Sequence, residues 1–308
     1  MGWRLRYREF MAALFVGFCL LAGACSGGSG SGSGGEATAG EIVVGSKSFT
    51  ENQILGEIYA QALEGAGFKV RHRSGLGSLN ILGPALKKGE VNFVPEYVGN
   101  SLSFFSSGKI PPTSDGEKNR QELAAVLEPD GIAVLNMAPG QDQNAFAVTS
   151  EQAKKHSLKT VSDLKPIAPE WVFGGPPDCP QREDCLKGLE DVYGLHFKAF
   201  RSLDVGGPLT IIALVQDEIQ LALLFSTSPF IQKEDLVVLE DSKGIVAAEN
   251  VVPLVRDNVL DDKLTSVVNA VSAQITTDAL IEMNSKVDLD GEDPAVVARE
   301  FLKSNGLG

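Results

Sequence analysis

Lys47 stands where it could bind a small anion. It follows Gly45, which ends a short β-branched run, and it precedes the start of a helical pattern at Thr50. A loop that leads into a helix presents free N–H groups and the positive end of the helix dipole, so a lysine there is suited to hold a carboxylate. A lysine exposed to solvent is the alternative interpretation.

Tyr97 is a candidate for the wall of a binding cleft. It follows Pro95 and Glu96 at the end of an apolar run. Because proline disfavours the middle of a sheet, the tyrosine is predicted at the edge of a loop. Its ring face could line a cleft, or the ring could pack against its own loop.

Arg182 is a second candidate for binding an anion. It lies between Cys179 and Cys185, shortly after an apolar run at 171–173. In an oxidising compartment these two thiols are predicted to form a local disulfide. The disulfide would restrict the loop and reduce the entropy that the arginine loses on binding an anion. A surface arginine is the alternative.

Several classes of function are disfavoured by motifs and charge. The segment 75–80 (GLGSLN) lacks the third glycine and the acidic residue of a dinucleotide-binding fingerprint. The sequence has no P-loop, G-x-S-x-G or H-E-x-x-H motif, and its three histidines (72, 156 and 196) are far apart. With 40 acidic and 27 basic residues the net charge is −13, which repels nucleic acid. We therefore expect no enzyme, no metal, no cofactor and no nucleic-acid partner.

The elements that must position these residues follow an α/β pattern. A strand is predicted at 41–45, a helix from Thr50 to about Gly65, and a second strand at 68–72. Ser48 and Glu51 have the spacing of a capping box at the start of the helix. The same alternation recurs along the chain, which predicts an α/β fold with largely parallel sheets.

An internal similarity indicates two related lobes. Residues 85–100 and 213–228 align without gaps, and each predicts a helix end, a turn, a buried strand and an aromatic residue, Tyr97 or Phe225, at the end of that strand. Ligands of open α/β sheets bind at this end of the strands, so the two rings are predicted to face one cleft. We assign residues 41–143 and 236–308 to lobe 1 and residues 144–235 to lobe 2. The chain would cross between the lobes near 140–146 and 230–237.

The first 40 residues have the features of an export and anchoring segment. Arginines at 4, 6 and 8 precede an apolar run from Met11 to Ala22, which predicts a signal peptide over residues 1–24. Cys25 follows small residues, as in a bacterial lipobox, so we expect a lipid on its thiol. An ordinary signal peptide with an incidental cysteine is the alternative. Residues 25–40, rich in Gly and Ser, would then form a flexible tether behind the anchor.

Five stretches in order resemble the glycine betaine/choline/carnitine (quaternary-amine osmoprotectant) family of ABC-transporter substrate-binding lipoproteins. They are residues 45–51 (GSKSFTE), 55–59 (LGEIY), 75–78 (GLGS), 95–97 (PEY) and 236–241 (LVVLED), the last followed by Lys243 and Gly244. The resemblance covers the chain from about residue 42 to its end. It implies a two-lobed, hinged fold of the periplasmic-binding-protein type II, which delivers a compatible solute to a membrane permease.

The resemblance also implies a set of ligand-binding residues. In this family a box of aromatic rings, usually tyrosines, holds the quaternary ammonium, while Lys and Arg hold the carboxylate. The matching positions here are Lys47, Tyr97, Asn100, Asn144, Phe146, Arg182, Ile211 and Phe225. Phe146 and Phe225 stand where tyrosines are usual, and Ile211 stands where a ring is usual. A more apolar or aromatic ligand is therefore an alternative to glycine betaine.

Together these observations predict an extracytoplasmic, lipid-anchored, monomeric binding protein of an ABC importer. Two other classes stay open. Carboxylates such as Asp204, Asp217 and Glu218 could serve an enzyme on the same fold, although helix caps explain them more simply. A surface adhesion protein would show no change of shape on ligand binding.

Overall fold

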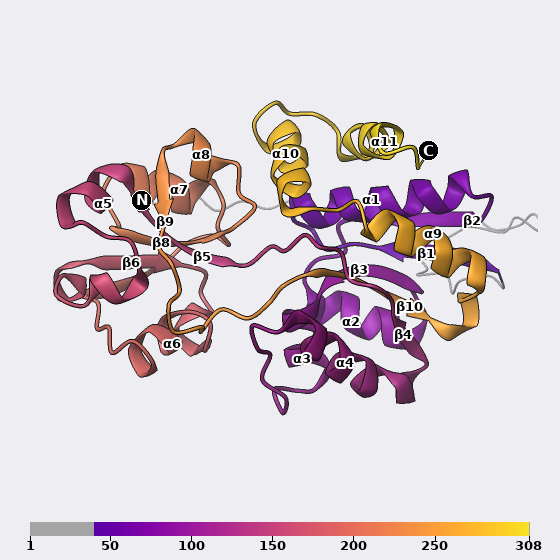
Figure 1. Ribbon diagram of the computed structural model, residues 1–308, viewed down its shortest axis with the longest axis horizontal. Helices are drawn as coiled ribbons and strands as arrows, with labels where there is room; N and C mark the ends of the chain where they lie inside the picture. Colours follow the sequence, from indigo (N-terminus) through magenta and orange to yellow (C-terminus); the bar gives the residue numbers. More distant parts are fainter. Residues whose placement is uncertain (1–39, 308) are drawn as a thin grey trace, which may run out of the picture. The chain divides into compact units, whose positions relative to one another are not determined.

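The computed structural model describes residues 40–307, which contain two five-stranded mixed β-sheets (Figure 1). The first sheet has the strand order β2-β1-β3-β10-β4 and the second the order β7-β6-β8-β5-β9. The strands of the first sheet are β1 (Glu41–Gly45), β2 (Lys69–Arg73), β3 (Phe93–Tyr97), β4 (Ile132–Val134) and β10 (Val251–Arg256). Those of the second are β5 (Asn144–Thr149), β6 (Val172–Gly175), β7 (Ala199–Ser202), β8 (Leu221–Phe225) and β9 (Leu236–Val238).

The two sheets have the same topology. In each, a central strand (β3 or β8) pairs in parallel with one neighbour and antiparallel with the other. Both central strands have five residues and end on an aromatic residue, Tyr97 or Phe225. The strands begin and end at the same positions of the gapless alignment found in the sequence, so the internal similarity corresponds to a repeated arrangement of strands.

The sheets are less parallel than the sequence predicted. β10 runs antiparallel between β3 and β4, and β5 runs antiparallel between β8 and β9. Both β5 and β10 follow a segment in which the chain comes from the other sheet. They are therefore not part of a βαβ crossover, which is the connection that produces parallel neighbours.

Helices cover both faces of the first sheet. On one face, Ile42 and Val44 of β1 pack with α1 (Thr50–Gly65), α9 (Asp262–Ser272), α10 (Thr277–Asp288) and α11 (Pro294–Ser304). On the other face, Val43 packs with α2 (Leu79–Lys88), α3 (Val98–Phe105) and α4 (Gly116–Leu127). Successive β1 residues thus alternate between two cores, which is the pattern of a strand buried on both faces.

The second sheet is also covered on both faces. Phe146 and Val148 of β5 pack in a core with α5 (Ser150–His156) and α6 (Leu186–Asp191), whereas Ala147 packs toward α7 (Pro208–Val215). The short helix α8 (Phe230–Lys233) precedes β9. Single 3₁₀ turns occur at Glu128–Asp130, Val161–Leu164, Ala168–Glu170, Cys179–Gln181 and Asp257–Val259.

Two chain segments connect the sheets, residues 135–143 and residues 239–250 (Figure 1). The first lies close to the predicted crossing at 140–146. The second lies later than the predicted crossing at 230–237, because Leu236–Val238 pair with β5 in the second sheet. Residues 236–238 therefore belong with the second sheet and not with lobe 1, to which the sequence had assigned them.

The start of α1 differs from the predicted capping box. Phe49 occupies the N-cap position and makes no side-chain cap. Glu51 is instead buried and accepts hydrogen bonds from Tyr97 and Asn284. The carboxylate that the spacing assigned to a helix cap thus serves a buried network.

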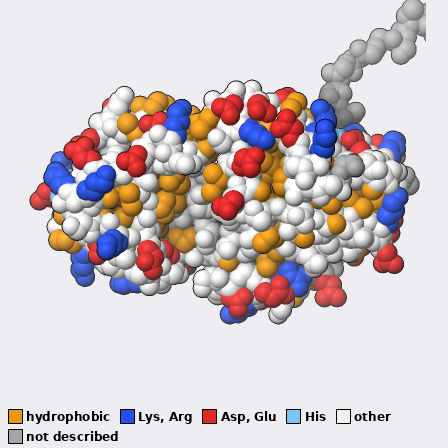
Figure 2. Space-filling model, turned by 45° about the horizontal axis from the view of Figure 1, so that its top comes forward, with side chains coloured by type: hydrophobic (Ala, Val, Ile, Leu, Met, Phe, Trp, Pro, Cys, Tyr) orange, Lys and Arg blue, Asp and Glu red, His pale blue; other side chains and the backbone are white. Residues whose placement is uncertain are grey.

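In the part of the chain that the structure describes, none of the helices has the length and hydropathy needed to cross a membrane. The predicted signal peptide, Cys25 and the tether up to residue 39 lie outside the described residues. Figure 2 shows charged side chains of both signs scattered over the face in view, with hydrophobic side chains between them.

Candidate functional site

A cavity of about 630 Å³ lies between the two sheets. It is lined from the first sheet by the loop after β1, the loop before α2 and the start of α3. From the second sheet it is lined by β5 and β8 and by the disulfide loop, and both connecting segments contribute as well. The predicted residues that line it are Lys47, Tyr97, Asn100, Asn144, Arg182 and Phe225.

Three aromatic rings form one wall of the cavity. Phe49 stacks on Tyr97, with ring centroids 6.0 Å apart, and on Phe225, with centroids 6.2 Å apart. Phe49 precedes α1 and Tyr97 ends β3, both in the part of the chain that forms the first sheet, whereas Phe225 ends β8 of the second sheet. The three rings therefore connect the two sheets. Phe49 was not among the residues predicted from the sequence, although it lies two positions after Lys47 in the same loop.

Lys47 is buried and paired. Its Nζ lies 2.8 Å from Oε2 of Glu96 and 4.7 Å from the centroid of the Tyr97 ring. Its backbone N–H donates to Oδ1 of Asn52 at 2.6 Å, which fixes the loop against α1. Lys47 is therefore not a surface lysine, and the charge that it brings to the cavity is matched by a fully buried carboxylate.

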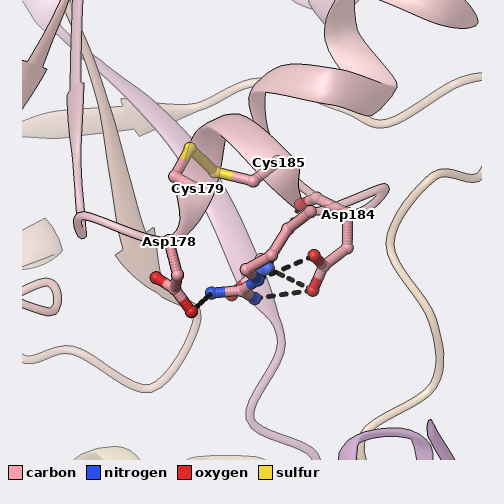
Figure 3. The surroundings of a disulfide bond; sticks show 6 residues. Asp178, Cys179, Asp184 and Cys185 are labelled. Carbon is pink, nitrogen blue, oxygen red and sulfur yellow. Dashed lines mark hydrogen bonds and ion pairs between the residues drawn. A yellow bond between two sulfur atoms is a disulfide. The ribbon is translucent and has the colours of Figure 1, made fainter. Parts of the chain in front are cut away.

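Arg182 lies in the loop that the Cys179–Cys185 disulfide closes, as predicted. Figure 3 shows this disulfide together with Asp178 and Asp184. Its Nε and Nη2 donate to the two carboxylate oxygens of Asp184, at 2.9 and 2.6 Å, and its Nη1 lies 3.9 Å from Asp178. Burial opposes the charged guanidinium, but these carboxylates raise the pKa of Arg182. Arg182 lines the cavity, but its Nε and Nη2 donors are already hydrogen-bonded to Asp184.

Asn144 supports the same loop from β5. Its Nδ2 donates to the backbone oxygen of Asp184 at 3.2 Å and to the carboxylate at 2.8 Å. The amide therefore fixes the carboxylate that holds Arg182, and Asn144 lines the cavity at the end of its strand.

Glu249 comes from the second connecting segment and covers the start of α3. Its Oε2 accepts the backbone N–H of Gly99 at 3.1 Å and of Asn100 at 3.0 Å. A Cβ at Gly99 would lie 2.8 Å from Oε1 of the glutamate, so the glycine makes this approach possible. Burial raises the pKa of Glu249 to about 8. Glu249 was not among the residues predicted from the sequence.

A buried hydrogen-bond network links the two sheets beside the cavity, and two of its members, Tyr97 and Asp142, line the cavity. Glu51 accepts the Tyr97 hydroxyl at 2.7 Å and Nδ2 of Asn284 at 2.7 Å. Asn284 also donates to the backbone oxygen of Thr227 at 3.3 Å, and Thr227 Oγ1 donates to Asp142 at 2.8 Å. Burial is the largest cause that holds the pKa of Asp142 well above its usual range, and repulsion by the Glu51 carboxylate adds to it. Burial likewise raises the pKa of Glu51.

Two of the predicted site residues do not line the cavity. Phe146 is 1% exposed and packs against Phe173 in the core of the second sheet, with ring centroids 6.2 Å apart. Ile211 is buried on the inner face of α7, against the other face of that sheet. Phe146 lies two residues further into β5 than Asn144, so its side chain meets the core and not the cleft. Neither Phe146 nor Ile211 contacts the cavity, so the prediction that they bind the ligand is wrong for this structure.

Two similar α/β units, joined by two chain segments and enclosing a cavity of ligand size, define a bilobed solute-binding protein. The predicted fold class is confirmed by the solved structures that this chain resembles. A crystal structure described as a glycine betaine/carnitine/choline ABC transporter aligns with a TM-score of 0.75 and 27% identity. The alignment covers 86% of this chain and 99% of that one.

Sequence comparisons identify the family. A model of the substrate-binding domain of the ABC-type glycine betaine transport system matches residues 40–304. A glycine-betaine-binding protein of Pseudomonas aeruginosa is 28% identical over 94% of this chain and 95% of its own length. An ergothioneine transport permease/ergothioneine binding protein of Helicobacter pylori is 27% identical over 86% of this chain and 48% of its own length. The chain belongs to the family of substrate-binding domains of ABC-type glycine betaine transport systems, which confirms the predicted resemblance.

Proposed function

We propose that the chain binds a small quaternary-ammonium solute in the cavity between its two sheets and delivers it to the permease of an ABC importer. The observation that carries the proposal is the wall of stacked rings formed by Phe49, Tyr97 and Phe225. A cation that leaves water gains about 0.5–2 kcal/mol from an aromatic face. Phe49 supplies a ring in place of the one that the sequence argument counted as lost at Ile211.

The size and charge of the cavity support such a ligand. A cavity of about 630 Å³ lies within the range of small-molecule sites. Its lining includes the basic residues Lys47 and Arg182 and acidic residues from both connecting regions and the disulfide loop. The rings would hold the ammonium group, and the polar side chains, Asn100 and Asn144 among them, would orient the rest of the molecule.

The anchoring part of the proposal rests on the sequence. A signal peptide over residues 1–24 and a lipid on Cys25 would place the folded body outside the cytoplasm and keep it near its permease. The Gly/Ser-rich tether would let that body reorient. We further propose that the protein acts as a monomer by stoichiometric binding, without turnover of its ligand.

A second candidate ligand class is a more apolar or aromatic compound. Phe49 and Phe225 present ring faces without hydroxyl groups, and one relative is named for binding ergothioneine. Stacking between these rings and a flat ligand would be worth about 0.5–1.5 kcal/mol per pair.

Thermal unfolding of the purified full chain, followed by intrinsic fluorescence, tests both candidates. The ligands would be choline, glycine betaine, carnitine, ergothioneine and uncharged sugars. A ligand that binds the native state at 100 times its Kd adds about 2.7 kcal/mol to the free energy of unfolding. Stabilisation by at least one quaternary amine, with an unchanged ligand recovered afterwards, is expected. Stabilisation by sugars alone, or chemical conversion of the bound compound, would contradict the proposal.

A further inference from the structure

We propose that the cavity prefers ligands with a net positive charge over zwitterions, and that Glu249 is a residue that sets this preference. The inference rests on the proposed function, because it concerns which quaternary amines the same cavity accepts. The preference follows because carboxylates of the protein are already bonded to the N–H and ammonium donors of the cavity.

The donors at the start of α3 are taken by the protein itself. A helix N-terminus at a cavity wall is suited to bind a ligand carboxylate. Here Oε2 of Glu249 accepts the N–H groups of both Gly99 and Asn100. The contact depends on a glycine, because a Cβ at Gly99 would also lie 2.8 Å from the backbone oxygen of Ala248. A carboxylate belonging to the chain thus stands where a ligand carboxylate would be held.

The two basic side chains of the cavity are paired in the same way. Nζ of Lys47 contacts Glu96 at 2.8 Å, and two nitrogens of Arg182 bind the two oxygens of Asp184. Oε1 of the buried Glu96 has no hydrogen-bond partner among the described residues. A ligand carboxylate would have to share these cations with carboxylates that are already bound to them.

The charges around the cavity favour a cation. Lys47 and Arg182 are its basic lining residues, whereas its acidic lining residues are Asp142, Asp178, Asp184 and Glu249. Burial holds the pKa of Asp142 high, so Asp142 is not counted as a charge. At pH 8.5 Glu249, with a pKa of about 8, is mostly ionised, and the three remaining carboxylates attract a positively charged ligand. The ammonium of that ligand can also lie against the ring wall. A zwitterion also brings its own carboxylate close to the carboxylates of the protein. Like charges repel in such a low-dielectric site.

Choline and glycine betaine provide the direct comparison, because both carry a trimethylammonium group and differ at the other end of the molecule. Isothermal titration calorimetry on the full chain at pH 8.5 should give a Kd for choline at least tenfold lower than for glycine betaine. In Glu249→Gln the choline Kd should rise about tenfold, while the glycine betaine Kd should stay equal or fall. Glu240→Gln, an exposed glutamate on the same connecting segment, should behave as the unaltered chain.

The outcomes separate the two proposals. Tighter binding of glycine betaine than of choline to the unaltered chain would overturn the inference and leave the proposed function standing. Equal weakening of both ligands in Glu249→Gln would show that Glu249 only supports α3, and would overturn its role in selection. Binding of uncharged compounds with neither quaternary amine bound would overturn the proposed function and the inference together. The first comparison needs no variant, so it holds even where Glu249→Gln fails to fold.

Discussion

Replacing Phe49 or Phe225 by leucine should weaken the binding of a quaternary ammonium through the loss of a ring face. Leucine keeps an apolar side chain of similar size but has no π-electron face. Each ring lies about 6 Å from the next in the stack, so the wall is continuous across the two sheets. A cation–π contact contributes about 0.5–2 kcal/mol. Each substitution should therefore raise the Kd roughly 2- to 30-fold, since about 1.4 kcal/mol corresponds to a factor of ten.

The assay should separate the cation–π contribution from simple packing. Choline and its uncharged carbon isostere 3,3-dimethyl-1-butanol have nearly the same shape, so calorimetry with both ligands isolates the effect of the charge. The affinity ratio between them should fall in Phe49→Leu and in Phe225→Leu. Phe230→Leu is a matched control, because Phe230 is a partly buried ring in α8 that does not line the cavity. An unchanged ratio in both cavity variants would refute the role of the rings as a cation site.

Three further predictions concern stability. Glu249 and Asp142 have raised pKa values, about 8 for the former, so the folded state binds more protons than the unfolded state between pH 5.5 and 8.5. The free energy of unfolding, measured by urea titration, should therefore fall as the pH rises across this range. Glu249→Gln should reduce this fall, and an unchanged dependence on pH in the variant would contradict the burial of the Glu249 carboxyl. Changing both Cys179 and Cys185 to serine should cost about 2 kcal/mol by loop entropy and weaken ligand binding, and equal stability in urea would contradict a formed disulfide. Lys47→Met should cost about 3–5 kcal/mol by leaving its buried carboxylate partner unpaired, and a loss below 1 kcal/mol would contradict the buried ion pair.

The fold and part of the site could be predicted because they depend on local patterns. Strand–helix alternation indicated the α/β class, and the gapless similarity placed Tyr97 and Phe225 at equivalent strand ends. The disulfide followed from two cysteines with a short separation. The antiparallel pairing of β5 and β10 could not be predicted, and neither could the return of the chain to the first sheet only after β9. Both depend on which sheet a segment joins.

The remainder of the site depends on contacts between distant segments. Phe146 and Asn144 share a face of β5, but the core ends between them, and periodicity does not show where a core ends. Glu249 reaches α3 from a connecting segment far along the chain. Glu51 has the spacing of a helix cap, although Tyr97 and Asn284 draw it into a buried network.

A crystal structure of the full chain with choline, compared with that of the ligand-free protein, tests binding in the cavity most directly. We expect one choline per chain in the cavity, with its ammonium within about 6 Å of the centroid of at least one ring in the wall of Phe49, Tyr97 and Phe225. Choline bound elsewhere on the surface, or a cavity without choline at saturating concentration, would show that the ring wall is not a quaternary-ammonium site.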